Sequence, residues 1–351
     1  MNLTKYALYT ALALVTYLLL LQWQEDYPDS VEQAGTERLS EPAASVPTLS
    51  PAPNQALSAS SQTPNTGSAA NEVPALPGAE VQLEATAEVD RKIVNVTTDT
   101  LELQIDTEGG DIVYLALPEY LKTLTEGADA FTLLSSEAGR EYTAPSGLIG
   151  PNGIDSDGRA QYTVAAEEFT LENGEQSLQV DLTTVTDSGV QVTKRFGFTA
   201  GSYVIDVSYL INNQSPEAFT ANPFGQIRRD SFDDPSDAGG FGRTYLGFVS
   251  TTIDDPYYEV EFDDIDDDGA STQQTLGGWM AFSQHYFISA WIPAETATNN
   301  FTTRKNLSGQ YFGEFTSQAV TVAPGQSARV DSRFYAGPKD QYKLAEISDN
   351  L

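Results

Sequence analysis

The sequence contains no cysteine and only one histidine, His285. The absence of thiols excludes disulfides, cysteine nucleophiles and cysteine-ligated zinc or iron–sulfur sites. It leaves the cellular compartment open, because a chain of 351 residues can bury a large core that needs no disulfides. Any acid–base chemistry that relies on histidine would have to use position 285.

Basic residues are also scarce. The chain has 18 lysines and arginines against 50 aspartates and glutamates, which gives a formal net charge of −32. A surface of this charge repels phosphate backbones, so we expect no nucleic acid partner. It repels anionic headgroups as well, so attachment to a membrane has to be hydrophobic.

One long hydrophobic run is present, and it lies at the N-terminus. Every residue from 7 to 21 is apolar or a tolerated Thr or Tyr, and residues 3–23 approach the ~20 that a helix needs to cross a bilayer. Lys5 precedes the run and acidic residues follow it, so the positive-inside rule places the N-terminus in the cytoplasm. A cleavable signal peptide would need small residues after the run, where positions 20–24 hold LLQWQ. We predict that residues 1–26 form an uncleaved transmembrane signal anchor, in contact with the lipid bilayer through residues 3–23.

The next segment is rich in proline and poor in large apolar residues. Residues 28–80 hold eight of the chain's 18 prolines, together with many Ala, Ser, Thr and Gln. Such a composition buries too little surface to offset the entropy of the chain. We predict that residues 27–80 are a disordered linker, which lets the following domain stand away from the membrane.

From about residue 91 onward, apolar residues alternate with polar ones. Leu101, Leu103 and Ile105 alternate with polar neighbours and end in the turn TEGGD. Short alternating strands between turns of Gly, Asn, Asp and Pro indicate an antiparallel all-β sandwich. We predict this domain over residues 81–338, with no helix of useful length inside it, and a short C-terminal helix that starts within residues 339–351. The other alternating sets are Leu178, Val180 and Leu182; Val190, Val192, Phe196 and Phe198; Tyr203, Ile205, Val207, Tyr209 and Ile211; and Val320, Val322, Val330 and Phe334.

The run GGWMAFSQHYFISAWIP at 277–293 contains the single histidine. Apolar residues occupy both of its alternating faces, which is typical of a strand buried on both sides. A histidine base needs a proton donor within reach and usually a carboxylate to orient it, and no GxSxG or similar motif supplies the partner. We predict that His285 is a packed residue at a polar break or bend with Ser283 and Gln284, and we predict no catalytic residue. The two faces are Met280, Phe282, Tyr286, Ile288 and Ile292 on one side and Trp279, Ala281, Phe287 and Trp291 on the other.

An acidic run, DDPYYEVEFDDIDDDGAS, occupies residues 254–271. Its segment 263–269 matches the first half of the D-x-D-x-D-G calcium loop. An EF-hand also needs a bidentate Glu at the twelfth position of the loop, where Thr275 stands. We therefore favour a solvated acidic loop over a calcium site, and we predict no metal ligand. The residues of the match are Asp264, Asp266, Asp268 and Gly269, and a weaker echo is Asp155 and Asp157 before Gly158.

Arg228 and Arg229 are unusual in so acidic a chain. They could bind a carboxylate or a partner protein. An intramolecular ion pair with the DDPSD loop at 233–237 is the interpretation that we favour. No phosphate-binding glycine loop, HExxH motif or dinucleotide-binding fingerprint is present, so we predict no cofactor.

The order of these parts resembles the YidC membrane protein insertases of Gram-negative bacteria, in which an uncleaved anchor and a linker precede a large β domain. Local strings carry the same resemblance, and the GGW…YF…AWIP string is specific. The strings are TEGGDIVYLALPEY at 107–120, YTAPSGLIGPNGID at 142–155, FGQIRRD at 224–230, GGWMAFSQHYFISAWIP at 277–293 and APGQSARVDSRFYAGPKDQYKL at 323–344.

The resemblance implies a periplasmic β-supersandwich similar in shape to galactose mutarotase, with a helical connection to the membrane beginning at residues 339–351. It implies that the whole protein inserts, folds and helps to assemble integral membrane proteins at the bacterial inner membrane, with or without the Sec translocon. Nascent membrane proteins, the Sec translocon and the SecDF complex are the partners that it implies. In the family, the insertase core is a later bundle of five transmembrane helices, which these residues do not include. This part would tether the protein and contact partners without covalent catalysis, and an exposed strand edge of the sandwich is a possible place for an extended polypeptide.

Two other function classes remain open on the sequence. The first is a membrane-anchored, mutarotase-like protein that binds or modifies carbohydrate, which would need His285 and carboxylates to converge in one cleft. The second is a structural surface module that binds calcium through the acidic run.

Overall fold

The computed structural model describes residues 92–351 except 124, 126, 138, 233–244 and 253, together with Pro74. The predicted anchor at 1–26 lies outside the described residues, as does the predicted linker at 27–80 apart from Pro74. In the described part of the chain, no helix is both long and apolar enough to cross a bilayer.

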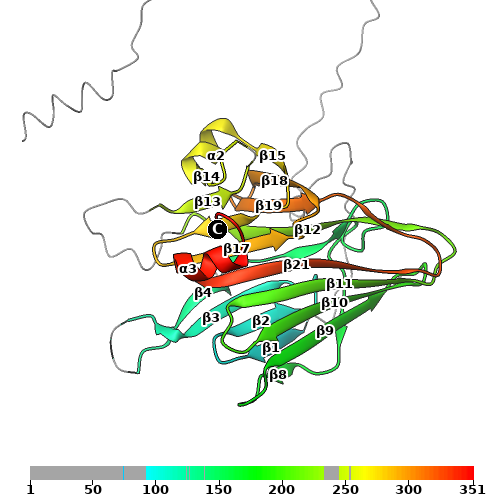
Figure 1. Cartoon of the computed structure of the whole chain (residues 1–351), viewed down its shortest axis with the longest axis horizontal. Helices are drawn as coiled ribbons and strands as arrows, with labels where there is room; N and C mark the ends of the chain where they lie inside the picture. The colour runs from blue at the N-terminus through cyan, green and yellow to red at the C-terminus, as the bar shows by residue number, and fades with distance from the viewer. Residues whose placement is uncertain are drawn as a thin grey trace, which may run out of the picture. The chain divides into compact units, whose positions relative to one another are not determined.

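The described residues fold into two β-sheets, and the predicted all-β class is confirmed (Figure 1). Every strand pair is antiparallel except the pair of β1 with β8. The larger sheet contains β1 (Ile93–Thr97), β2 (Glu102–Asp106), β3 (Ile112–Leu121), β4 (Ala130–Glu137), β5 (Arg140–Thr143), β6 (Ser146–Ile149), β8 (Glu168–Thr170), β12 (Phe219–Arg229), β15 (Ser271–Leu276), β18 (Thr298–Lys305), β19 (Tyr311–Ser317) and β20 (Val320–Val322). The second sheet contains β7 (Thr163–Val164), β9 (Ser177–Val185), β10 (Val190–Thr199), β11 (Val204–Asn213), β13 (Gly247–Ser250), β14 (Tyr258–Glu261), β16 (Met280–Ser283), β17 (Phe287–Pro293) and β21 (Ser327–Pro338).

The long strands of the second sheet show why the sequence folds this way. In β10, Val192 and Phe196 are fully buried, while Gln191, on the opposite face of the strand, is exposed. In β11, Ile205 and Val207 are buried in the same way. Each buried aliphatic or aromatic side chain contributes roughly 1.5–3 kcal/mol, so a one-residue slip of either strand would be strongly disfavoured.

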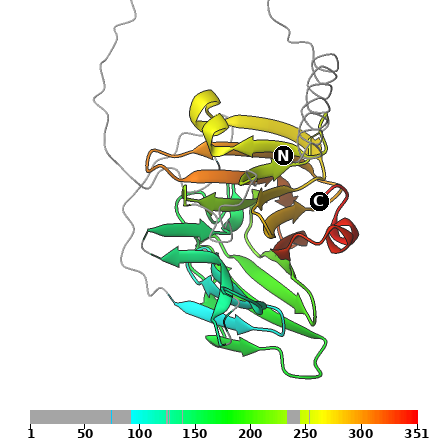
Figure 2. The same ribbon diagram turned by 90° about the vertical axis from the view of Figure 1, so that its left-hand side faces the viewer.

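The two sheets are joined through side chains that reach across the core. The hydroxyl groups of Tyr142 on β5 and Ser289 on β17 lie 2.7 Å apart. The indole Nε1 of Trp291 on β17 donates to the backbone oxygen of Gln226 on β12 at 2.9 Å. Trp291 is fully buried, so this bond satisfies a polar atom that would otherwise be costly to bury. The two layers can be followed in the side view of Figure 2.

The run at 277–293 forms a buried hairpin of β16 and β17, and not one continuous strand. Gln284 donates its backbone N–H to the oxygen of Phe287 at 2.9 Å, which closes the turn. The predicted polar break is therefore confirmed, and Met280, Phe282, Ile288 and Ile292 are buried as predicted. The prediction that Tyr286 is buried is wrong, because it lies in the turn, where the alternation of the strand is interrupted, and is 58% exposed.

A short helix that was not predicted from the sequence lies between β14 and β15. Helix α2 (Phe262–Asp268) has only seven residues, five of them aspartate, so its intrinsic propensity is low. A capping box between Glu261 and Asp264 holds its first turn, and Ile265 is buried against the core. These tertiary and capping contacts stabilise a helix that no periodicity indicates.

The predicted C-terminal helix is confirmed as α3 (Gln341–Ile347). Asp340 is its N-cap, and its carboxylate accepts from the backbone N–H of Tyr342 at 3.0 Å and of Lys343 at 3.4 Å. Leu344 is the buried residue of the helix. Beyond α3, the backbone oxygen of Asp349 accepts from the indole of Trp279 at 3.0 Å, so the end of the chain is held against the domain.

Candidate functional site

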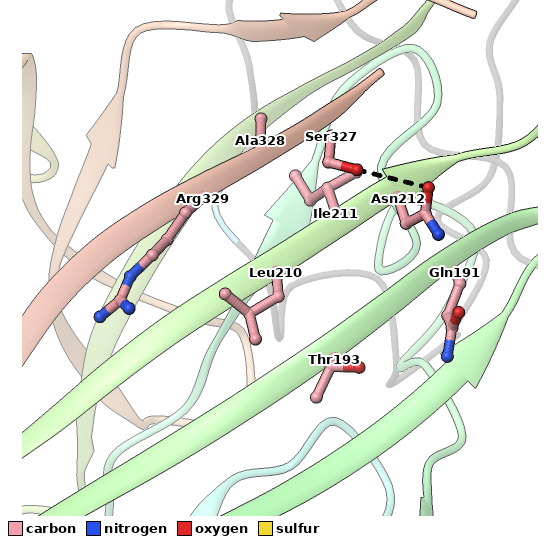
Figure 3. Close-up of a pocket in the computed structure, with 8 residues that line it drawn as sticks. All are labelled: Gln191, Thr193, Leu210, Ile211, Asn212, Ser327, Ala328 and Arg329. Atoms are coloured by element: carbon pink, nitrogen blue, oxygen red, sulfur yellow. Dashed lines mark hydrogen bonds between the residues drawn. The ribbon is translucent and has the colours of Figure 1, made fainter. Parts of the chain in front are cut away.

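A groove lies on the outer face of the second sheet, over β10, β11 and β21 (Figure 3). Its volume is about 460 Å³, and it is open to solvent. None of its lining residues is aromatic. They are Gln191, Thr193, Leu210, Ile211, Asn212, Ser327, Ala328 and Arg329.

These side chains form rows because the three strands pair in register. Gln191 on β10 lies opposite Asn212 on β11, which lies opposite Ser327 on β21. The hydroxyl of Ser327 and the amide oxygen of Asn212 are 3.4 Å apart, as the dashed line in Figure 3 marks. Residues two apart in a strand face the same side of a sheet, so the next row faces the same way. That row is Thr193, Leu210 and Arg329.

The charged side chains of the next row across the strands, which includes Arg195, Asp181 and Asp331, are paired with one another. Arg195 makes two hydrogen bonds to the carboxylate of Asp181, at 2.7 and 2.6 Å. The carboxylate of Asp331 accepts from Arg329 at 2.6 Å and from Ser208 at 2.7 Å. Because these charges offset each other locally, the groove presents mainly neutral hydrogen-bonding groups and one half-buried leucine.

A second groove of about 410 Å³ continues past Arg329 toward β17. Asp206 and Arg333 lie opposite each other there, across β11 and β21. Burial raises the pKa of the Asp206 carboxyl, and the neighbouring Arg333 guanidinium opposes that shift. The outer face of the second sheet is thus a long polar surface that can hydrogen-bond to a ligand across several strands.

The structure places His285 away from this face. It lies in the turn between β16 and β17 and is partly buried, with its ring stacked on Tyr286 at a centroid distance of 4.1 Å. It is not among the residues that line either groove. His285 is therefore packed at the predicted polar break, which is the turn between β16 and β17.

The acidic run does not form a loop with calcium-ligand geometry. Asp264 caps α2, while Asp266 accepts from Lys305 at 2.6 Å and from Tyr311 at 2.9 Å. In a helix, residues two apart point in different directions, so Asp264 and Asp266 cannot converge on one ion as in an EF-hand loop. The prediction of a solvated loop is wrong, because 262–268 are helical. Within the described residues, no group of three or more potential ligands is arranged to hold a metal ion.

Both arginines of the FGQIRRD string pair with carboxylates. Arg228 binds Glu141 at 2.9 Å, and Arg229 binds Asp230 next to it in the chain. Arg229 is almost fully buried and also lies 5.2 Å from the ring centres of Tyr142 and Phe282. Burial lowers its pKa. The predicted partner loop at 233–237 lies outside the described residues.

Comparison with known sequences identifies the family. A family model of the YidC periplasmic domain matches residues 93–351. The chain belongs to the YidC family. Curated relatives named membrane protein insertase YidC align with the whole of this chain. The identity is 39% for the proteins of Pseudomonas putida strain W619 and Pseudomonas fluorescens strain SBW25, and 40% for that of Stutzerimonas stutzeri strain A1501. These relatives are named as insertases and not as enzymes.

The chain spans 61% of the length of each of these YidC relatives. Solved structures also resemble it in part. A galactose mutarotase related enzyme from Lactobacillus acidophilus is 11% identical with a TM-score of 0.46, and the match covers 70% of this chain and 97% of that one. A galactose mutarotase-like protein from Lactobacillus casei is 8% identical with a TM-score of 0.45, and covers 70% and 99%. At these scores the likeness bears on neither ligand nor activity.

A buried ionic cluster, which was not predicted from the sequence, lies inside the YidC-family domain. Lys194 of β10 is fully buried, and its Nζ donates to the backbone oxygens of Gly109 at 3.0 Å and Ser146 at 2.9 Å. Arg159 lies beside it and binds Asp155 at 2.9 Å. Asp111 also accepts from Arg159. Two cations and two carboxylates therefore meet where the sheets face each other.

The weak calcium match at Asp155 and Asp157 is explained by this cluster. Asp155 is fully buried and accepts the backbone N–H of Leu148 at 2.9 Å and of Ala160 at 3.1 Å, whereas Asp157 is exposed. Burial raises the pKa of Asp155, and Arg159 opposes the shift. The carboxylate therefore fixes a loop and does not face a ligand.

The sequence of β10 contains one feature that could have indicated the buried ionic cluster. Lys194 occupies the apolar phase of the strand, between Val192 and Phe196, where a charge has to be buried. Burial lowers its pKa to about 7, against the opposing effect of Asp111. A lysine in an inward position thus indicates a buried partner, but not which one.

Proposed function

We propose that this chain is the N-terminal and periplasmic part of a membrane protein insertase. The observation that carries the proposal is the match of residues 93–351 to the YidC periplasmic domain, together with about two-fifths identity to named insertases along the whole chain. The whole protein inserts, folds and helps to assemble integral membrane proteins, with or without the Sec translocon. This part tethers the domain and contacts client and partner proteins, which include the Sec translocon and the SecDF complex.

Complementation tests the proposal. The full-length protein that carries this sequence is expressed in a cell depleted of its own YidC, and insertion of reporter membrane proteins is followed by protease protection. We expect insertion to recover. Normal accumulation of the protein with no recovery of insertion would contradict the proposed function.

The proposed arrangement has residues 1–26 as the membrane anchor, 27–80 as the linker, 81–338 as the periplasmic domain and 339–351 as the start of the connection to an insertase core. The apolar run at 3–23 and the basic residue before it support this arrangement. Protease added to intact spheroplasts is expected to digest the domain, and protection of the domain until the inner membrane is opened would refute the orientation.

The outer face of the second sheet supports the contact role. Its rows of neutral donors and acceptors suit an extended polypeptide that lies across β10, β11 and β21, and Leu210 gives an apolar point of contact. A photocrosslinker at Gln191 in the full-length protein is expected to capture clients or Sec components, and one at Gln310 in the β18–β19 turn serves as the control. Equal capture at the two positions would argue against the groove.

We also propose that this part of the protein acts by contacting client and partner proteins and not by covalent catalysis. The location of His285 in a turn, outside both grooves, supports it. Replacing His285 by Gln is expected to leave insertion unchanged. Sugar turnover by the unaltered chain that this substitution abolishes would instead favour the carbohydrate-active alternative.

A further inference from the structure

A set of exposed apolar and basic side chains lies away from the grooves, where β3 ends and α3 begins (Figure 1). Leu121 is 50% exposed, Tyr286 58% and Tyr342 78%. One such residue on a surface is ordinary, whereas a cluster of them marks an interaction site. Lys122, Lys339 and Lys343 are exposed beside them. We call these six residues the tyrosine–lysine patch.

Contacts between the three segments make the patch one surface. Lys339 donates its backbone N–H to the oxygen of Tyr286 at 2.8 Å, which ties the segment before α3 to the β16–β17 turn. The Nζ of Lys343 lies 5.8 Å from the ring centre of Tyr203. Tyr203 in turn donates to Glu119 at the end of β3 and lies 6.5 Å from Tyr120. Residues far apart in the sequence are therefore neighbours here.

The patch stands on a packed base. Phe287, next to Tyr286, is buried and stacks on Phe131 at a centroid distance of 4.3 Å. Tyr120, next to Leu121, meets the edge of Phe287 at 5.3 Å. Because these anchors are fixed in the core, the exposed side chains need no large rearrangement before they bind.

Composition indicates what the patch binds. It holds three of the chain's seven lysines and none of its eleven arginines. The cores of protein–protein interfaces are enriched in arginine and depleted in lysine. Tyrosine is enriched both there and at membrane–water interfaces, so lysine is the residue that discriminates, because it extends its ammonium group from an apolar stem toward lipid phosphates. The combination of tyrosine, leucine and lysine therefore fits a lipid surface better than a protein.

The local charge balance agrees with this assignment. The two segments that carry the three lysines, 119–129 and 339–346, hold five carboxylates, whereas the whole chain has 18 basic against 50 acidic residues. Glu119 accepts from Tyr203, and Asp340 caps α3, so these two carboxylates are held in hydrogen bonds. Repulsion from anionic headgroups is therefore much weaker at the patch than the net charge of −32 suggests.

We propose that the tyrosine–lysine patch docks on the headgroup region of the membrane and so fixes which end of the domain faces the bilayer. The inference rests on the proposed function only in that the domain has to stand at a membrane. Tyr286, Tyr342 and Leu121 enter the interface, and Lys122 and Lys343 reach lipid phosphates. The Nζ of Lys339 donates to the hydroxyl of Ser283 at 3.0 Å and to the backbone oxygen of Gln284 at 3.1 Å, so Lys339 holds the β16–β17 turn in place. Docking leaves the outer face of the second sheet open to proteins.

The absence of cysteine allows a direct test. Single cysteines replace Tyr342 or Leu121 in the full chain, which is reconstituted in vesicles of phosphatidylcholine and phosphatidylglycerol and labelled from outside with an environment-sensitive fluorophore. Brominated lipids are expected to lower the emission at both positions about twofold, because interfacial side chains reach the acyl boundary. The matched control is Leu307→Cys, at a turn residue that is 98% exposed and lies outside the patch.

A second substitution in the labelled proteins distinguishes docking of the patch from the mere closeness of the domain to the membrane that the anchor causes. Adding Tyr286→Ser to the probe at Leu121 is expected to abolish quenching, and Lys343→Gln is expected to lower the ratio of docked to free domain about fivefold on these vesicles. Quenching equal to that of the Leu307→Cys control overturns the proposal. Protection of the probes only when Sec proteins are added, without lipid quenching, also overturns it and assigns the patch to a protein.

The same proteins distinguish this inference from the proposed function. If insertion recovers in the depleted cell but the patch shows no quenching, the docking proposal is wrong and the proposed insertase function stands. Quenching at the patch without recovery of insertion supports docking and refutes the insertase role.

Discussion

Replacing Lys194 by methionine should remove a pH dependence that is built into the core. Burial lowers the pKa of Lys194 to about 7, whereas an unfolded lysine titrates near 10.4. Between these values the unfolded chain binds more protons at this residue than the folded chain does, so stability rises with pH. Integrated from pH 7 to pH 9, the effect is about 2 kcal/mol in the free energy of unfolding. The slope fades as the pH falls through 7, and well below that value both states are protonated and the residue gives no slope.

The substitution is well suited to the test because it leaves the neighbouring carbonyl groups paired. Arg159 also donates to the backbone oxygens of Gly109 at 3.2 Å and Ser146 at 2.9 Å. Methionine keeps the length of the side chain and removes its charge. We expect the difference in stability between the unaltered chain and Lys194→Met to change by about 2 kcal/mol between pH 7 and pH 9.

Urea unfolding of the full chain in detergent, followed by tryptophan fluorescence, measures this difference, because Trp279 and Trp291 are both buried. Burial raises the pKa of Tyr162 and Tyr209, and their effect begins only near pH 10 and is common to both proteins. The control is Lys92→Met, at an exposed ion pair, which should show no such slope. A variant at position 194 that keeps the full slope would refute the reasoning.

Three further outcomes follow from the packing. Arg159→Leu leaves the buried carboxylate of Asp155 without its ion-pair partner and should lower the free energy of unfolding in urea by about 3–5 kcal/mol. An unchanged urea midpoint would contradict the stabilising role of this ion pair. Gly313→Ala places a methyl group against the ring of Phe248 and should cost about 1–3 kcal/mol by the same assay, whereas a neutral result would mean that the sheets separate easily there. Calcium should leave the thermal midpoint unchanged, because carboxylates of the run 254–271 already cap α2 or bind neighbours, and a calcium-dependent rise would restore the surface-module hypothesis.

The outer groove could be predicted only in part. Alternation along β10 and β11 already assigns Gln191, Thr193 and Asn212 to the outward phase. That these residues form one surface depends on the pairing of β11 with β21, which joins residues more than a hundred positions apart. Periodicity is a local property of one strand, so it does not indicate which strands become neighbours.

The sequence by itself determined the class of fold, the strand phases, the polar break within 277–293 and the presence of the C-terminal helix, because each follows from residues close together in the chain. The tertiary structure alone decided the partners of Lys194, which lie 85 and 48 positions away at Gly109 and Ser146. It also decided that α2 is a helix, because the buried Ile265 and the Lys305 bond to Asp266 outweigh a poor propensity. Long-range contacts fix these features, and their energies depend on burial that no short stretch of sequence contains.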